Sequence, residues 1–153
     1  MATRALPLLE VVGEGWSRLK CPISELRLDI VLKCGQSFRW RLISPGVWAS
    51  VLYDDVWILS QNDTEILYKV YSSSDSDAAT AKSKTKQREA QLRDYFQLDL
   101  CSLSEMYANW RLNDPYFDAC CDQFKGVRTL RQHPVENLFS FICSSNNNIA
   151  RIR

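Results

Sequence analysis

The chain has a single histidine, His133, and its six cysteines form no Cys-x-x-Cys pair. Structural zinc sites use closely spaced Cys and His ligands, so the sequence does not predict a zinc site. A lone histidine also argues against a Ser-His-Asp hydrolase. No apolar run approaches the ~20 residues that span a bilayer, and residues 1–10 do not read as a signal peptide. We therefore expect no metal, no cofactor and no membrane partner, in a reducing intracellular setting.

Basic and acidic residues are nearly balanced, at 19 and 18, for a net charge of +1. The chain thus lacks a general positive field, and any DNA-binding surface must be local. Paired catalytic carboxylates are not evident either. Asp54 and Asp55 are adjacent, and neighbours on a strand point to opposite faces.

Alternating apolar residues between positions 26 and 71 predict short strands joined by tight turns. Phe38, Trp40 and Leu42 alternate with polar residues, and Pro45-Gly46, Asp54-Asp55 and residues 61–63 mark turns. We expect an antiparallel meander with one buried face. Residues 72–86 are rich in Ser, Asp and Lys and predict a mobile loop, because they offer little apolar area to bury.

After Gln87 the apolar period becomes helical. Helix starts are marked by a Ser102-x-x-Glu105 capping box, by Asp114-Pro115 and by Pro134, and Gly126 suits a helix end. The residues expected to face inward are Leu92, Tyr95, Phe96, Leu103, Met106, Tyr107, Trp110, Phe117, Cys120, Cys121, Phe124, Leu138, Phe139 and Ile142. The thiols expected to be free and buried are Cys120, Cys121 and Cys143.

Strands followed by helices predict an α+β fold. We expect a flexible N-terminus over residues 1–20, an antiparallel sheet with helices over residues 21–124, and the start of an all-helical domain over residues 125–153. The sequence shows no internal repeat.

Two polar segments are candidate binding elements. Gly35 leaves room for a ligand to approach the backbone, and the next five residues, Gln-Ser-Phe-Arg-Trp, add polar reach and flat surfaces. The alternative is a turn glycine that leads into a half-buried strand. The second segment joins Asn146, Asn147, Asn148 and Arg151, whose amides and guanidinium suit base edges. If Ser144 or Ser145 caps a last helix, the asparagines form its first turn; the alternative is a loop with solvated asparagines.

Lys125, Arg128 and Arg131 form a third, basic segment between two helices. They are suited to holding DNA phosphates. A solvated basic face is an equally acceptable interpretation of the same residues.

Several blocks of the chain together resemble the eukaryotic 8-oxoguanine DNA glycosylases. They are Ser24–Asp29, Gly35–Trp40, Tyr95–Asp99, Gly126–Gln132 and Phe139–Arg151. The resemblance runs from about Cys21 to Arg153 and is weakest in residues 72–86. It implies a sheet domain like that of the TATA-binding protein, and a monomeric repair enzyme that acts on damaged double-stranded DNA in the nucleus and also in the mitochondrion.

The resemblance also implies residue roles. Such enzymes flip oxidised guanine out of the duplex into a pocket and remove it opposite cytosine, with an associated lyase step. Gly35 matches a glycine whose carbonyl reads the altered N7 position. Asn146 and Arg151 match contacts to the orphaned cytosine, and Asn147 and Asn148 belong to the run that fills the gap left by the flipped base.

The catalytic lysine and assisting aspartate of the family belong to a helix-hairpin-helix segment, which we expect beyond Arg153. No lysine present here has such surroundings, so the resemblance assigns no catalytic residue and predicts that these 153 residues alone are inactive. Two hypotheses follow. The chain is the recognition half of a glycosylase and lyase, or it is a natural truncated form that binds DNA or protein without catalysis.

Overall fold

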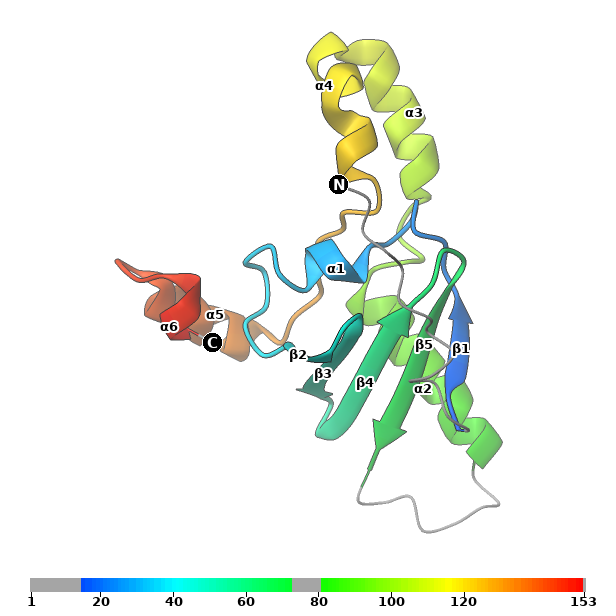
Figure 1. Cartoon of the computed structure of the whole chain (residues 1–153), viewed down its shortest axis with the longest axis vertical. Helices are drawn as coiled ribbons and strands as arrows, with labels where there is room; N and C mark the ends of the chain where they lie inside the picture. The colour runs from blue at the N-terminus through cyan, green and yellow to red at the C-terminus, as the bar shows by residue number, and fades with distance from the viewer. Residues whose placement is uncertain (1–14, 73–80, 153) are drawn as a thin grey trace.

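The computed structural model describes residues 15–72 and 81–152 of the chain. Five strands form one antiparallel sheet in the order β1-β5-β4-β3-β2 (Figure 1). Their bounds are Ser17–Lys20 for β1, Arg41–Ser44 for β2, Val47–Leu52 for β3, Asp55–Gln61 for β4 and Glu65–Tyr71 for β5. Strands β2 to β5 are consecutive in sequence and adjacent in the sheet. The predicted α+β fold and its meander are confirmed.

The tight turns of the meander have backbones that suit their residues. In the β3–β4 hairpin, Tyr53 and Asp54 have positive φ angles of 52° and 67°, as in the two-residue turns that match the twist of strands. The turn lies one residue earlier than the predicted Asp54-Asp55, and Asp55 begins β4. After β4, the Asn62 side-chain oxygen accepts two backbone N–H groups at 2.9 and 2.8 Å, as expected for the turn predicted there.

The edge strand β1 corrects the expectation of a flexible N-terminus over residues 1–20 at residues 17–20 alone, because residues 1–14 lie outside the described part of the chain. Residues 17–20 pair with β5, and Leu19 lies opposite Ile66 with only 1% of its surface exposed. Burial of such a side chain contributes about 1.5–3 kcal/mol toward ordering this short strand. The partner strand is distant in sequence, so local periodicity carries no signal for the pairing.

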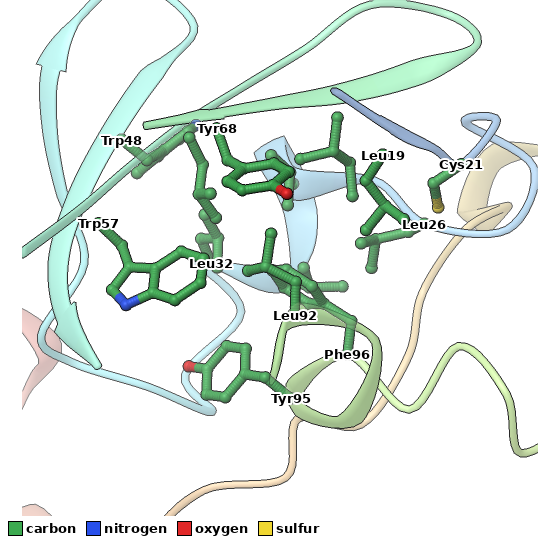
Figure 2. Packing of buried hydrophobic residues seen from close by; sticks show 14 of the residues in the cluster. Leu19, Cys21, Leu26, Leu32, Trp48, Trp57, Tyr68, Leu92, Tyr95 and Phe96 are labelled. Carbon is green, nitrogen blue, oxygen red and sulfur yellow. The ribbon is translucent and has the colours of Figure 1, made fainter. Parts of the chain in front are cut away.

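Helix α2 (Ala81–Tyr95) covers one face of the sheet, and the short helix α1 (Leu28–Val31) adds two buried residues to the same core (Figures 1 and 2). Trp57 and Tyr68, on adjacent strands, stack with ring centroids 6.0 Å apart. The residues predicted to share the inner face of α2 are all buried: Leu92, Tyr95 and Phe96. Helix α1 was not predicted, because its four residues lie inside a stretch of mainly two-residue period.

Helix α2 begins within the predicted loop. Of residues 72–86, positions 73–80 lie outside the described part of the chain, whereas residues 81–86 are helical. The prediction is wrong for these residues because Lys and Ala favour helix even when they are solvated. With Leu92 and Phe96 anchored in the core, each additional helical residue gains a backbone hydrogen bond without the cost of a new nucleus.

Helices α3 (Leu103–Asn113) and α4 (Pro115–Cys120), continued by the 3-10 turn η3 (Cys121–Phe124), form a hairpin that projects from the sheet (Figure 1). The predicted N-caps are confirmed. The Ser102 hydroxyl accepts a backbone N–H at the start of α3, and the Asp114 carboxylate accepts two at the start of α4.

Burial in the hairpin differs from the prediction. Three aromatic rings join the two helices with centroids 5.2–5.6 Å apart. They belong to Tyr107, Trp110 and Phe117. Cys121 is buried, but Cys120, Phe124 and, in part, Trp110 are exposed, because a helix with one neighbour buries only one stripe. Cys143 is exposed as well, so only one of the three thiols is buried as predicted.

Helices α5 (Pro134–Ser144) and α6 (Ile149–Ile152) end the described chain, and α5 starts at the predicted proline. The expectation that α5 turns its apolar side chains inward is wrong for this structure. Leu138, Phe139 and Ile142 are 58–60% exposed, because none of the described elements covers them. In the ranges 15–72 and 81–152, no helix has the length and apolarity that crossing a bilayer requires.

Candidate nucleic-acid interface

The loop between α1 and β2 carries Gly35. This glycine has a φ of +85°, a left-handed backbone that side chains disfavour. Among the described residues, no heavy atom beyond its chain neighbours lies within 4 Å of the position a Cβ would take. The space beside the α-carbon is therefore open, and a ligand can approach the backbone there.

Two of the residues after Gly35, Ser37 and Trp40, pack inside the protein and are not available to a ligand. Residues 37–40 were predicted to be strand, but β2 begins only at Arg41, because Trp40 turns into the core. Its Nε1 donates to the Tyr95 hydroxyl at 3.0 Å. Burial raises the pKa of Tyr95, although hydrogen bonds to Trp40 and Ser37 oppose that shift. Ser37 is buried too, so neither Ser37 nor Trp40 offers the predicted polar reach or stacking surface.

The loop after Gly35 and helices α5 and α6 share a shallow hollow of about 460 Å³. Its lining residues are Phe38, Arg39, Arg41, Glu136, Phe139, Ser140, Cys143 and Ile152. Arg39 and Glu136 form an ion pair at 2.7 Å, which ties the loop to the first turn of α5. The fold therefore brings the first candidate segment beside the helices that hold the second.

The asparagines lie in the turn between α5 and α6, and the cap differs from the prediction. Asn148, not Ser144 or Ser145, precedes α6, and its side-chain oxygen accepts the Arg151 N–H at 3.2 Å. The Asn147 amide donates to the Cys143 carbonyl at 2.9 Å and caps the end of α5. Both side chains are thus used to shape the turn.

Asn146 and Arg151 are different. Asn146 has a φ of +50°, which asparagine tolerates better than most residues. Both residues are exposed. Within the described ranges, neither the Asn146 amide nor the Arg151 guanidinium makes a hydrogen bond or an ion pair. These two polar groups are therefore available to a partner.

The basic cluster was a candidate phosphate site, and the structure removes one of its three residues, Arg128, from that role. Lys125 pairs with Asp122 at 2.7 Å, and Arg131 pairs with Asp94 at 3.0 Å. Arg128 is buried, with 5% of its side chain exposed. Arg128 is therefore not free to hold a phosphate, whereas the exposed pairs of Lys125 and Arg131 are weak enough to open for one.

Arg128 instead joins three segments of the fold. It pairs with the Glu25 carboxylate at 2.6 Å and donates to the backbone carbonyls of Glu25, Gln97 and Cys101 at 2.6 to 3.0 Å. The same carboxylate accepts two backbone N–H groups at the start of α3, at 2.7 and 3.0 Å. Glu25 therefore neutralises the arginine and also caps the helix.

This arrangement predicts an acid-dependent loss of stability. Burial by itself would raise the pKa of Glu25, but hydrogen bonds from Ser104, Leu103 and Arg128 outweigh it and hold the pKa below the usual 4.5. A lowered pKa stabilises the fold above pH 4.5, and that contribution is lost as the pH falls through the folded-state value.

We therefore expect the free energies of unfolding of the protein and of Glu25→Gln to differ most at neutral pH and to converge below pH 4.5. Urea unfolding at several pH values measures this. A constant difference between pH 7 and pH 3 would show that Glu25 is not the titrating group.

A sequence model of a known family matches residues 18–138, and its description is 8-oxoguanine DNA glycosylase, N-terminal domain. The chain belongs to the 8-oxoguanine DNA glycosylase family. The match includes the Gly35 loop and ends at Leu138, before the asparagine turn. The family resemblance inferred from the sequence is thereby confirmed.

Two curated relatives agree with the family. The chain is 33% identical over 139 residues to the N-glycosylase/DNA lyase OGG1 of Arabidopsis thaliana, covering 90% of this chain and 35% of the relative. It is 36% identical over 144 residues to the N-glycosylase/DNA lyase of Saccharomyces cerevisiae, covering 84% and 34%. The chain therefore spans about a third of the length of these curated relatives.

Solved structures of the family share the fold. MBOgg1 in complex with a low-affinity DNA ligand has a TM-score of 0.66 at 25% identity, covering 92% of this chain and 44% of that one. The 8-oxoguanine glycosylase/lyase of Clostridium acetobutylicum matches with a TM-score of 0.61 at 27% identity. It covers 83% of this chain and 40% of its own in the apo form, and 83% and 39% in complex with double-stranded DNA that has cytosine opposite 8-oxoguanine.

The sequence named Gly35 and the asparagine turn as candidates, gave Gln36 a different role from the one observed, and did not indicate Glu25. Gln36 was expected to reach toward a ligand, and instead it bonds to residues 128–130. Glu25 was not singled out at all. In the sequence Glu25 is only one acidic residue of the block Ser24–Asp29. Its partner Arg128 lies 103 positions away, so the sequence does not indicate their pairing.

Proposed function

We propose that this chain is the damage-recognition half of a DNA repair enzyme that removes 8-oxoguanine opposite cytosine and then cleaves the abasic strand. Family membership carries this proposal. The Clostridium relative bound to DNA with cytosine opposite 8-oxoguanine supports the choice of substrate. The setting we propose is nuclear DNA, with mitochondrial DNA as a second substrate, and the complete protein acts as a monomer.

The Gly35 carbonyl is the proposed reader of the oxidised base. 8-Oxoguanine has a hydrogen on N7, whereas guanine presents a lone pair there. A carbonyl oxygen accepts a hydrogen bond from the N7–H of 8-oxoguanine. Against guanine the same oxygen has no donor and faces the N7 lone pair, which is another acceptor. The open space beside the Gly35 α-carbon supports this role, because a flipped base must come close to the backbone.

Asn146 and Arg151 are the proposed contacts to the orphaned cytosine, and the asparagine turn is proposed to occupy the gap in the duplex. Both side chains are exposed and have no partner among residues 15–72 and 81–152, which supports this assignment. Asn147 and Asn148 hold the turn in shape, so we assign them a supporting role. A short amide and a planar guanidinium together match the donor and acceptor edge of cytosine.

We also propose that these 153 residues do not excise the base by themselves. A lysine that forms a Schiff base is usually activated by desolvation or by a neighbouring cation. Among the lysine side chains that the structure describes, none is buried. Lys125 is paired with Asp122, and Lys33 and Lys69 lie over the rings of Trp48 and Tyr71.

Borohydride trapping on a duplex with one 8-oxoguanine opposite cytosine tests both parts. The chain of 153 residues is compared with the same chain extended to the natural end of its coding sequence. We expect a trapped covalent adduct only with the extended protein. We also expect Arg151→Ala to weaken binding to this duplex. The control is Arg18→Ala, which changes a remote surface arginine and should leave binding unchanged.

A trapped adduct from the 153-residue chain would mean that an amine of this chain is the nucleophile, and the proposal that it does not excise the base would fail. If the extended protein traps nothing, the glycosylase and lyase proposal fails. A truncated, non-catalytic DNA- or protein-binding role then becomes the better interpretation.

A further inference from the structure

The Gln36 side chain crosses from the Gly35 loop to the segment of residues 128–132. Its Nε2 donates to the Arg128 carbonyl at 2.8 Å, and its Oε1 accepts the Leu130 N–H at 2.9 Å. A neighbouring strand would satisfy the same two backbone groups in this way. One carboxamide therefore takes the place of a strand partner, although neither segment is part of the sheet.

A second contact joins the Gln36 backbone to the segment of residues 128–132. The Gln132 side chain donates to the Gln36 backbone carbonyl, so both the side chain and the main chain of Gln36 are held by the same segment. That segment is itself well fixed. Leu130 is in the core with 5% exposure, and Arg128 is in the buried ion pair with Glu25.

Gly35 has no comparable restraint of its own. Its φ of +85° is accessible to glycine without strain, and its side is open. The Gly35 carbonyl, however, shares a planar peptide unit with the nitrogen and α-carbon of Gln36. Restraining Gln36 therefore restrains the direction in which the Gly35 carbonyl points.

We propose that Gln36 is a positioning residue that aims the Gly35 carbonyl and sets it at a fixed place relative to the segment that leads into α5. This inference rests on the proposed function, in which that carbonyl reads the base. A misaimed carbonyl loses its hydrogen bond to the oxidised base, and one such bond changes an equilibrium constant by up to about ten-fold. Loss of the Gln36 restraint should therefore lower base selectivity more than it lowers stability.

The test uses the extended protein and measures the ratio of its dissociation constants for duplexes with guanine and with 8-oxoguanine opposite cytosine. Gln36→Met keeps the side-chain length and removes all three side-chain hydrogen bonds, the third being the Nε2 contact to Cys34 Sγ at 3.2 Å within the Gly35 loop. Gln36→Glu keeps the acceptor for Leu130 and provides a second variant if the first does not fold. The matched control is Gln97→Asn, since the Gln97 Nε2 donates to the Thr129 carbonyl at 2.8 Å but does not touch the Gly35 loop.

We expect the ratio of dissociation constants to fall up to about ten-fold in Gln36→Met and to fall in Gln36→Glu as well. In Gln97→Asn it should change less than about two-fold. Free energies of unfolding, measured in parallel, should fall in all three. An unchanged ratio in the folded Gln36 variants, or an equal fall in Gln97→Asn, overturns the inference alone. If the unsubstituted protein shows no preference for 8-oxoguanine, the proposed function and this inference fail together.

Discussion

Replacing Arg128 with leucine should lower the free energy of unfolding by about 3–5 kcal/mol, the usual cost of leaving one charge of a buried pair without its partner. The Glu25 side chain keeps 21% of its surface exposed and retains its hydrogen bonds to α3. We therefore expect the lower end of that range. In a chain of this length the melting temperature should drop by about 6–12 °C.

The control is the same substitution in an exposed ion pair. Arg39 pairs with Glu136 at 2.7 Å, but 46% of the arginine side chain is exposed, so Arg39→Leu should cost about 1 kcal/mol or less. Thermal melts of both variants decide the point. Equal losses would mean that the three carbonyl contacts and the Glu25 pair contribute no more than a surface charge does.

The second large effect is expected at Gly126. Its φ is +74°, and a Cβ there would lie 2.2 Å from the backbone oxygen of Ile23 and 3.0 Å from the backbone nitrogen of Arg27. The Gly126 carbonyl also accepts the Arg27 N–H at 2.8 Å. Gly126→Ala must move a hydrogen-bonded main chain, and we expect a loss of about 3–5 kcal/mol.

Gly46 is a control that separates the cost of the left-handed backbone from the cost of the steric clash. It has nearly the same φ, +73°, but no heavy atom of the described residues outside its chain neighbours lies within 4 Å of its Cβ position. Gly46→Ala should therefore pay only the left-handed backbone cost of about 1–2 kcal/mol. Urea unfolding of the two variants gives the difference, and similar losses would show that the clash at Gly126 relaxes freely.

Features that depend on neighbouring residues were predictable from the sequence. The β2–β5 meander follows from apolar alternation and turn residues, and the caps at Ser102 and Asp114 act within a few positions. Where two local signals compete, sequence reasoning failed. Ser144, Ser145 and Asn148 are all acceptable caps, and the choice of Asn148 depends on how the turn after α5 closes.

Long-range features were not predictable. Gln36, Arg128 and Arg39 are polar residues of the kind that usually serve as binding groups, yet each is used to join segments about 90 to 100 positions apart. Only the fold shows that they are already paired. Asn146 and Arg151 are the opposite case: the side chains of these two residues have no partner in the described part of the chain, which favours them as binding groups.

The position of β1 has a consequence for how this domain acquires its structure during synthesis. Strands β2 to β5 pair with their immediate neighbours, so the meander can assemble as it leaves the ribosome. β1 must wait for β5, because Leu19 is covered only once Ile66 has been made. Of the described strands, β1 is therefore translated first but has no partner until β5 is complete, and a nascent chain stalled before Tyr71 would present an incomplete edge to chaperones.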